Sequence, residues 1–233
     1  MLGGVGALRW YGDELAVVTV GRLDAHIVGP DGTATELRLN EELGRPAVVN
    51  RAVAGLPQEI GWVAVVDPGV ALAPGALDRL RAAAVPRAGL LGPLLRDPTR
   101  RQINSCGSRP AFGALLRGRV LARPVTAGPT GWLDGRCVLI RRLAWDSVDG
   151  YDSRHIGTGA HPEPADVDLG DRLSGAGWLV LGVPEAEAVV HPVEGQGILD
   201  VRGAESRGRG LRRYVHDRYR APARALMALA RRG

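Results

Sequence analysis

The chain has 233 residues, of which 45% are hydrophobic and 24% charged, so it is long enough to bury the core of one sizeable α/β domain. Its net charge is +5 and all 30 basic residues are arginine, a balance that favours anionic partners such as nucleotides, phospholipids or nucleic acid. No apolar run reaches the ~18 residues of a transmembrane helix, and the first ten residues lack the apolar block of a signal peptide, so we expect a cytoplasmic protein.

The first half of the chain alternates strand-like and helix-like segments. β-Branched runs predict strands at 14–20 and 23–28, the second ending in the turn-forming GPDGT. Residues 33–44 fit a short strand or a helix. The spacing of apolar residues then predicts a helix over 45–56, a buried strand over 61–69, a helix over 71–85 with Pro74 near its first turn, and a strand over 88–97.

The second half resumes this alternation after an irregular stretch. Residues 98–131, rich in Arg, Gly, Ser and Pro, predict a long excursion that carries a strand or two. We then expect a strand leading into a short helix over 132–148, a loop over 150–165, a helix over 166–177, a strand over 178–184, a strand or extended segment over 186–195, and a helical arginine-rich end over 200–233.

Alternating strands and helices predict an α/β fold with a mostly parallel central sheet flanked by helices. Ligands of such sheets bind outside the carboxyl ends of the strands. Asp67 ends the clearest strand, GWVAVVDPG, and the acidic stretch that opens at Asp166 is a second candidate for the same edge. We expect one domain over 1–200 and a helical extension over 201–233.

The stretch PADVDLGDRL (164–173) has a structural and a catalytic interpretation. Acidic residues at a helix start stabilise the positive end of its dipole without any chemistry. Asp168 and Arg172 are four residues apart and predict a helical ion pair, whereas Asp171 pairs poorly. Asp166 is then left to face a cleft, where its carboxylate can take a proton from an acceptor hydroxyl.

Several residues could hold a metal ion. Asp67-Pro68-Gly69 is either a turn or the place where Asp67 binds a divalent cation. His191 is a structural donor unless it faces Asp67 in space. His155 and His161 fit an exposed loop, or a cluster with Glu163 that has no recognised metal spacing. The two cysteines predict free thiols in a reducing compartment, since neither has a partner at metal-ligand spacing: Cys106 and Cys137.

Other motifs exclude some functions and leave the end of the chain open. The sequence has no P-loop, no dinucleotide fingerprint in a strand-turn-helix setting and no G-x-S-x-G elbow. The arginine-rich segment 208–232 fits a terminal helix packed on the domain, or a cationic helix at an anionic membrane surface. Nucleic-acid binding is disfavoured because no base-stacking module lies nearby.

Five ordered segments resemble the inverting family-2 glycosyltransferases, and among them the actinobacterial rhamnosyltransferase-like enzymes that modify polyprenyl-linked cell-envelope glycans. They are GWVAVVDPGVALAPGALDRL, AGLLGPLLRD, GWLDGRCVLIRR, GYDSR and ADVDLGDRLSGAGWLVLGVPEAEAVVH, and they cover about residues 45–200. The resemblance implies a GT-A fold, a single Rossmann-like domain that binds a nucleotide sugar and a divalent cation, Mg²⁺ or Mn²⁺. It further implies a polyprenyl-linked or cell-wall glycan as acceptor.

The resemblance also implies roles for individual residues. Asp166 takes the place of the catalytic base and His191 that of a metal-site histidine, with Asp67 as a substitute metal ligand. The residues implied to contact substrate are Asp31, Asn50, Trp132, Asp134, Gly135, Asp168 and Arg172.

Three departures from the family pattern coincide with functional positions. Ala165 stands where the glutamate before the catalytic aspartate is expected, and Gly69 where the metal-binding aspartate is expected. The first helix is missing, and Gly29-Pro30-Asp31-Gly32 replaces Asp-Asn-Gly-Ser at the nucleotide position. We therefore carry two hypotheses: an inverting glycosyltransferase, peripheral on the inner face of the cell membrane, and a degenerate relative that binds a glycan or a partner.

Overall fold

One mixed β-sheet forms the centre of the computed structural model, which describes residues 15–20, 24–29, 32–38, 44–111, 120–155, 163–192, 210 and 212–218. In the described part the strands follow the order β3-β2-β1-β4-β10-β6-β11-β5, and β8 pairs with β11 beside this path. Their bounds are β1 Leu15–Val20, β2 Asp24–Val28, β3 Ala34–Arg38, β4 Trp62–Val66, β5 Val70–Leu72, β6 Ala88–Arg96, β8 Gly128–Pro129, β10 Cys137–Arg141 and β11 Leu179–Val190.

The main strands of this sheet share one direction. β1 is parallel to β4, and β6 is parallel to β11. β10 lies antiparallel between β4 and β6, so those two strands also point the same way. The carboxyl ends of β1, β4, β6 and β11 therefore lie toward one edge of the sheet, and the predicted α/β class is confirmed.

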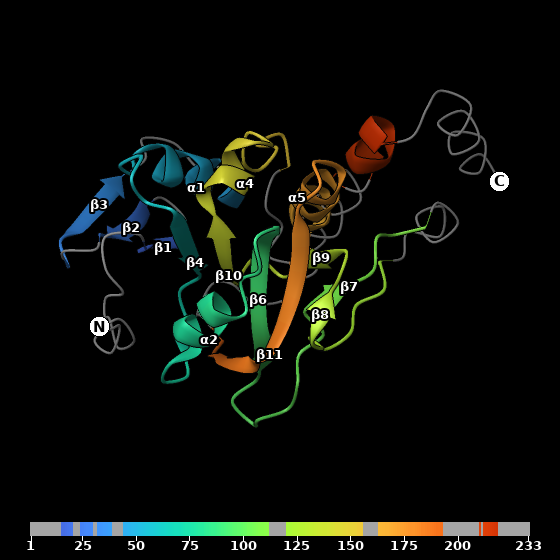
Figure 1. Ribbon diagram of the computed structural model, residues 1–233, viewed down its shortest axis with the longest axis horizontal. Coiled ribbons are helices and arrows are strands. Elements are labelled where there is room, and N and C mark those ends of the chain that lie inside the picture. Colours follow the sequence, from blue (N-terminus) through green and yellow to red (C-terminus); the bar gives the residue numbers. More distant parts are fainter. Residues whose placement is uncertain are drawn as a thin grey trace.

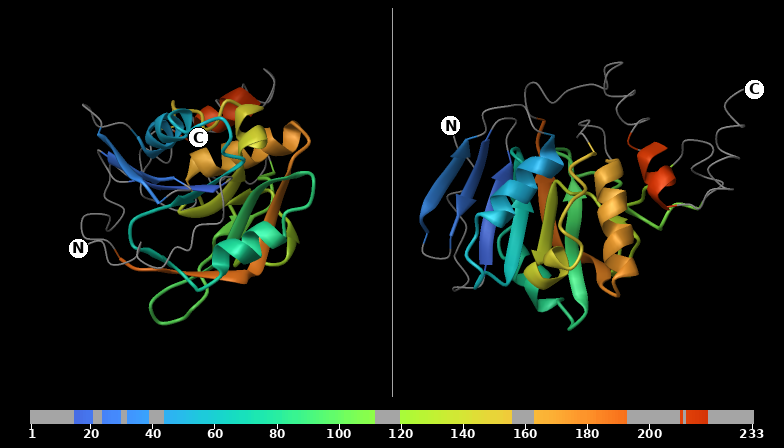
Figure 2. Two further views of the ribbon diagram at one scale, coloured as in Figure 1. Left: turned by 60° about the vertical axis from the view of Figure 1, so that its left-hand side comes forward. Right: turned by 90° about the horizontal axis from the view of Figure 1, so that it is seen from above.

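Helices cover both faces of the sheet (Figures 1 and 2). On one face lie α1 (Arg45–Ala54), α4 (Arg142–Asp146) and α5 (Pro164–Gly175), and on the other lies α2 (Ala76–Ala82). Side chains of β4 alternate between the two cores, with Val63 and Val65 in one and Ala64 in the other. Burial on both faces explains why GWVAVV reads as a continuous apolar run.

The N-terminal strands form an antiparallel hairpin instead of a strand-helix-strand unit. β1 pairs antiparallel with β2, and β2 pairs antiparallel with β3. The expected loss of the first helix is therefore observed. Residues 33–44, which fitted either element, contain the mostly exposed strand β3.

Three boundaries differ from the predicted ones. Residues 70–72 pair with β11 as strand β5, so α2 begins only at Ala76, after the left-handed Gly75. The two late segments form the single strand β11, which carries an irregularity between Val183 and Glu187. Helix α5 begins at Pro164, two residues early, because proline suits the first helical turn.

The acidic stretch on α5 also ties the helix to later residues. Asp171, which we expected to pair poorly, forms an ion pair with Arg218 at 2.5 Å. It also accepts a hydrogen bond from Tyr214 Oη at 3.4 Å. Tyr214 belongs to helical residues 212–218 and packs with Trp132 and Val167. The division into a domain over 1–200 and an extension over 201–233 stays a prediction.

No helix in the described part of the chain combines the length and apolarity needed to cross a membrane.

Close packing of α5 on strand β9 (Trp132–Leu133) requires a glycine at position 170. A Cβ there would overlap the carbonyl oxygen of Gly131 and lie 3.0 Å from Trp132 Cα. We expect Gly170→Ala to lower the free energy of unfolding by about 1–3 kcal/mol, since backbone cannot move aside cheaply.

Gly175 on the same helix supplies the control, because a Cβ there meets nothing within 4 Å. Gly175→Ala should leave stability unchanged or raise it by up to about 1 kcal/mol. Denaturant unfolding measures both variants, and equal effects would contradict this account of the packing.

Candidate active site

Asp67 lies just past the carboxyl end of β4, at the edge where ligands of such sheets bind. Its backbone N–H donates to the carbonyl of Arg136 at 2.8 Å, which fixes the start of the turn against the loop before β10. The turn continues through Gly69 at a φ of 84°, and Val70 N donates back to Asp67 O at 3.1 Å. The residue is 8% exposed, so its carboxylate needs a nearby positive charge.

Arg45 supplies that charge from the first position of α1. Its Nε lies 3.0 and 3.1 Å from the two carboxylate oxygens of Asp67, and Nη2 lies 2.9 Å from Oδ1. Nη2 also donates to the carbonyl of Gly135 in a short contact. Burial opposes the charge on Arg45, but Asp67, Tyr151 and Asp166 outweigh it and raise the pKa of the guanidinium well above its usual value.

Tyr151 connects Arg45 to Asp166. Arg45 Nη1 donates to Tyr151 Oη at 3.4 Å, and Tyr151 Oη donates to Asp166 Oδ1 at 3.0 Å. Burial and the Asp166 carboxylate raise the pKa of Tyr151, against the opposing effect of Arg45, so the phenol keeps its proton. Asp166, 2% exposed in the first turn of α5, therefore accepts a hydrogen bond from a hydroxyl group.

Gly135 lets the loop before β10 approach this network. A Cβ at position 135 would overlap Asp166 Oδ1 and lie 2.7 Å from Tyr151 Oη and 2.8 Å from Arg45 Nη1. The structure thus joins Asp67, Gly135 and Asp166 in one continuous set of contacts. Arg45 and Tyr151 complete the set, and the sequence analysis assigned neither a role.

Each missed residue left a signal in the sequence. An arginine at the start of a helix opposes the helix dipole, so Arg45 needs a carboxylate partner from elsewhere in the chain. Tyr151 lies within GYDSR, one of the segments that carry the family resemblance.

Asp134 forms a second ion pair beside this network. Its carboxylate holds Arg136, with Nε–Oδ1 at 3.0 Å and Nη2–Oδ2 at 2.6 Å, and Asp134 itself is 2% exposed. Burial disfavours the charge on Arg136, but Asp134, Asp67 and Asp166 raise its pKa. Three carboxylates and two guanidinium groups therefore lie close together at this edge.

Other predicted substrate residues have contacts that hold the fold. The side chain of Asn50 donates to Tyr151 O at 2.8 Å and accepts from Tyr151 N at 3.0 Å. Trp132 is fully buried. These placements do not support direct contact of Asn50 or Trp132 with a sugar.

Asp168 and Arg172 form the predicted helical ion pair, with Nε–Oδ2 at 2.7 Å. Arg172 also donates to the carbonyls of Val148 and Gly150, both at 2.7 Å. This pair therefore anchors the segment before Tyr151 to α5. Asp31 and His161 lie outside the described residues.

The cysteines match their prediction, since Cys106 and Cys137 are both buried free thiols. Burial, with Asp67 and Asp134 nearby, raises the pKa of Cys137, so this thiol remains protonated and unreactive.

Comparisons with known proteins agree with this architecture. No family model matches the chain. Over 185 residues it is 38% identical to the N-acetylglucosaminyl-diphospho-decaprenol L-rhamnosyltransferase of two Mycobacterium tuberculosis strains, CDC 1551 / Oshkosh and ATCC 25618 / H37Rv. The match takes in 66% of this chain and 58% of each relative, so the chain spans somewhat more than half of their length.

A solved structure shows the same fold. The crystal structure of GalNAc-T7 with UDP, GalNAc and Mn²⁺ superposes with a TM-score of 0.51 at 13% identity, over 75% of this chain and 35% of the other. The chain therefore has a GT-A fold and is similar in sequence to these family-2 glycosyltransferases.

A divalent cation does not fit the place where this family would hold one. Arg45 already contacts both oxygens of Asp67, and Gly69 offers no side chain. The backbone N–H of His191 donates to Gly69 O at 2.8 Å, and the residue is exposed. Among the described residues, neither of the two groups able to hold a metal includes Asp67 or His191.

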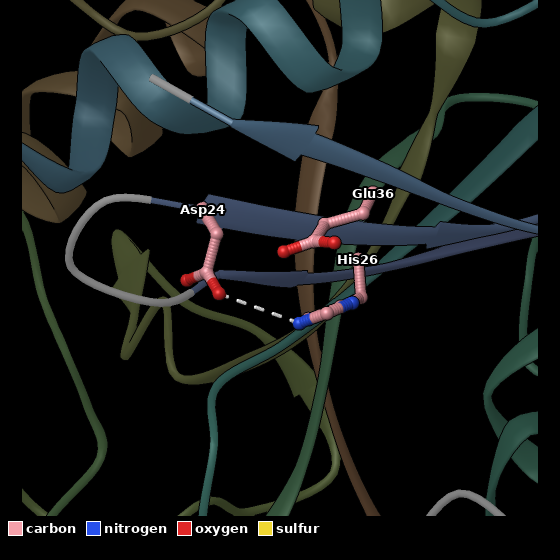
Figure 3. A group of neighbouring side chains, drawn as sticks. All are labelled: Asp24, His26 and Glu36. Carbon is pink, nitrogen blue, oxygen red and sulfur yellow. Dashed lines mark ion pairs between the residues drawn. The ribbon is translucent and has the colours of Figure 1, made fainter. Parts of the chain in front are cut away.

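One of those two groups lies on β2 and β3, at one end of the strand order. Asp24, His26 and Glu36 extend from β2 and β3 (Figure 3). His26 Nε2 lies 3.4 Å from Asp24 Oδ2, and Glu36 pairs with Arg38 at 3.0 Å. All are at least partly exposed, so this group is a set of solvated ion pairs.

The Arg45–Asp67 pair should contribute measurably to the free energy of unfolding. Arg45→Met would leave Asp67 buried without its counter-charge, and we expect the free energy of unfolding to fall by about 3–5 kcal/mol. Adding Asp67→Leu removes the stranded charge, so the double variant should be more stable than Arg45→Met alone.

Chemical denaturation of the single and double variants measures this coupling. Arg38→Met removes an arginine from an exposed ion pair and should leave the unfolding curve unchanged. Additive effects of the substitutions at positions 45 and 67 on the free energy of unfolding would show that the two side chains do not stabilise each other.

Proposed function

We propose that the chain transfers a sugar, with inversion, from a nucleotide-sugar donor to a lipid-linked glycan acceptor. The observation that carries the proposal is the position of Asp166, whose carboxylate accepts a hydroxyl hydrogen bond and is linked through Tyr151 and Arg45 to Asp67 at the carboxyl end of β4. The curated relatives, named as decaprenol-linked rhamnosyltransferases, support an acceptor of the polyprenyl-diphosphate class.

In this mechanism Asp166 acts as the general base. The acceptor hydroxyl donates its proton to Asp166 while its oxygen forms a bond to the anomeric carbon of the donor. The bond between that carbon and the diphosphate oxygen breaks on the opposite face, and the electron pair leaves with the nucleotide diphosphate. One displacement inverts the anomeric configuration, and the proton on Asp166 passes to solvent.

The charge of the leaving diphosphate falls to arginine side chains, because Asp67 does not fit a divalent cation. Arg45 and Arg136 lie at this edge, where they pair with Asp67 and Asp134. Each already neutralises a carboxylate, so the positive charge left for a diphosphate is small.

That shortage favours a second candidate, a catalytically degenerate GT-A protein that binds a glycan or a partner without transfer. Its specific support is the unbroken series of contacts from Asp67 through Arg45 and Tyr151 to Asp166. Both carboxylates are less than a tenth exposed, so substrate must displace Tyr151 or Arg45 to reach them.

Asp166→Asn tests the first candidate, since asparagine keeps the shape and can still accept from Tyr151 but cannot take a proton. Transfer from a nucleotide sugar to a polyprenyl-diphosphate glycan should fall by about 10²–10⁴-fold. The affinity for UDP, GDP or dTDP, measured by calorimetry in EDTA, should stay that of the unaltered protein.

Asp146→Asn is the matched control, because Asp146 is exposed and its carboxylate pairs with Arg142, four residues earlier on the same helix. Unchanged turnover in Asp166→Asn would remove the base assignment. Failure of the unaltered protein to bind any of the three nucleotides, with or without Mn²⁺, would establish the degenerate candidate in its place.

We further propose that the arginine-rich end holds the protein at an anionic membrane surface, near a lipid-linked acceptor. Residues 212–218 pack on α5, and the segment beyond them adds four arginines: Arg220, Arg224, Arg231 and Arg232. A cationic segment with interleaved apolar residues is attracted to anionic headgroups.

Co-sedimentation with vesicles tests this contact. Binding to phosphatidylglycerol vesicles should exceed binding to phosphatidylcholine vesicles, weaken as salt rises, and fall in a chain truncated after residue 218. Equal binding to both lipids, or no effect of truncation, would contradict the proposal.

A further inference from the structure

Asp152, His155 and Asp168 form a polar group that the contacts of Asp67 and Asp166 do not use. Asp152 and His155 lie in the turn that follows Tyr151, and Asp168 lies on α5, two residues after Asp166. One oxygen of each carboxylate and one ring nitrogen of His155 all lie within 4.8 Å of one another.

His155 is the unusual member of this group. Its side chain is 2% exposed, and neither ring nitrogen has a hydrogen-bond partner within the described residues. A buried polar group in that condition destabilises the folded state. The ring therefore needs a partner, and it faces two carboxylates without bonding to either.

Neighbouring arginines hold the two carboxylates in place. Arg154 binds both oxygens of Asp152, at 2.8 Å from Nε and 2.6 Å from Nη2. Arg172 binds only Oδ2 of Asp168, and it is itself anchored on two backbone carbonyls. The Arg154 backbone N–H also donates to Oδ1 of Asp152 and Nε contacts both oxygens, so Arg154 fills the acceptor positions of Asp152.

The Arg154 side chain is 56% exposed and can move aside for a cation, whereas Arg45 on Asp67 is only 14% exposed and is held in place. Asp168 keeps acceptor positions for a cation beside Arg172. Such supporting hydrogen bonds are typical of residues that ligate metals.

We propose that Asp152, His155 and Asp168 bind a divalent transition cation, Zn²⁺ or Mn²⁺. An imidazole nitrogen with two carboxylate oxygens is a ligand set that suits these ions, and ligands about 2.1 Å from one ion lie up to about 4.2 Å apart. Atoms already within 4.8 Å of one another need to close only slightly. Water would fill the remaining coordination positions.

The cation would fasten the turn that carries Tyr151 to the helix that carries Asp166. It would act as a positioning device for the base, since the ion itself would not touch the reacting atoms. Cation binding does not depend on the proposed transferase activity; only this positioning role does.

The structure separates this site from the two alternatives for a metal. Arg45 contacts both carboxylate oxygens of Asp67. The other group is at least partly exposed and contains no buried unpartnered nitrogen: Asp24, His26 and Glu36 (Figure 3). Of the sites that the described residues offer, the one containing His155 should therefore account for an effect of Zn²⁺ or Mn²⁺.

Calorimetric titration of the EDTA-treated full chain with Zn²⁺ and with Mn²⁺ tests the site. We expect one equivalent of ion to bind and to raise the melting temperature, as a ligand of the native state must. His155→Gln and Asp168→Asn should each weaken the affinity by about 10-fold or more. His26→Gln and Asp67→Asn should not change it.

Binding retained in His155→Gln, or lost in His26→Gln, would overturn the assignment, as would the absence of saturable binding of both ions. NMR of the Co²⁺-loaded unaltered protein gives a readout that needs no variant, since the chain has only 5 histidines. A paramagnetic shift of the His155 ring is expected, and its absence would also overturn the site. Asp166→Asn should still bind the ion, so failure of the transferase proposal would leave this result standing.

Discussion

The ion pair between Arg45 and Asp67 links the charged side chains at the carboxyl ends of the central strands. It joins the start of α1 to the end of β4 and, through Gly135 and Tyr151, reaches the base candidate on α5. A cation on the amino end of a helix opposes the dipole, and a carboxylate at a buried strand end is costly alone. Each group compensates the other, so the charge of Asp67 is balanced by Arg45 without an ion from solution.

That balance bears on one departure from the family pattern, the glycine at position 69. With Gly69 in place of an acidic ligand, a metal ion would have few ligands here. The guanidinium group of Arg45 balances the charge of Asp67 instead. A guanidinium is fixed by its helix and cannot leave with a product. The GT-A fold is thus preserved, while the charges at the carboxyl ends of its strands are arranged differently.

Local patterns predicted much of this fold and less of the site. Apolar runs located β1 and β6 within one residue and the start of β4 within one residue, because burial on one or both faces of the sheet selects apolar residues. The end of β4 was predicted three residues too late. The predicted helix wrongly included residues 71–75, because pairing of β5 with β11 overrides the helical spacing at its start. The Asp168–Arg172 pair was predictable because both lie on one helix, whereas Arg45 and Asp67 are 22 residues apart and meet only through the sheet.

The N-terminal hairpin has a consequence for solubility. With two antiparallel strands in place of a crossover helix, the strand order within the described residues ends at β3, a mostly exposed strand with no described neighbour on its outer side. Such an edge invites another chain to add a strand and start aggregation. Glu36 and Arg38 are exposed charged side chains on this strand, and another chain pairing there would have to desolvate them (Figure 3 shows Glu36). The hairpin thus carries its own protection against self-association.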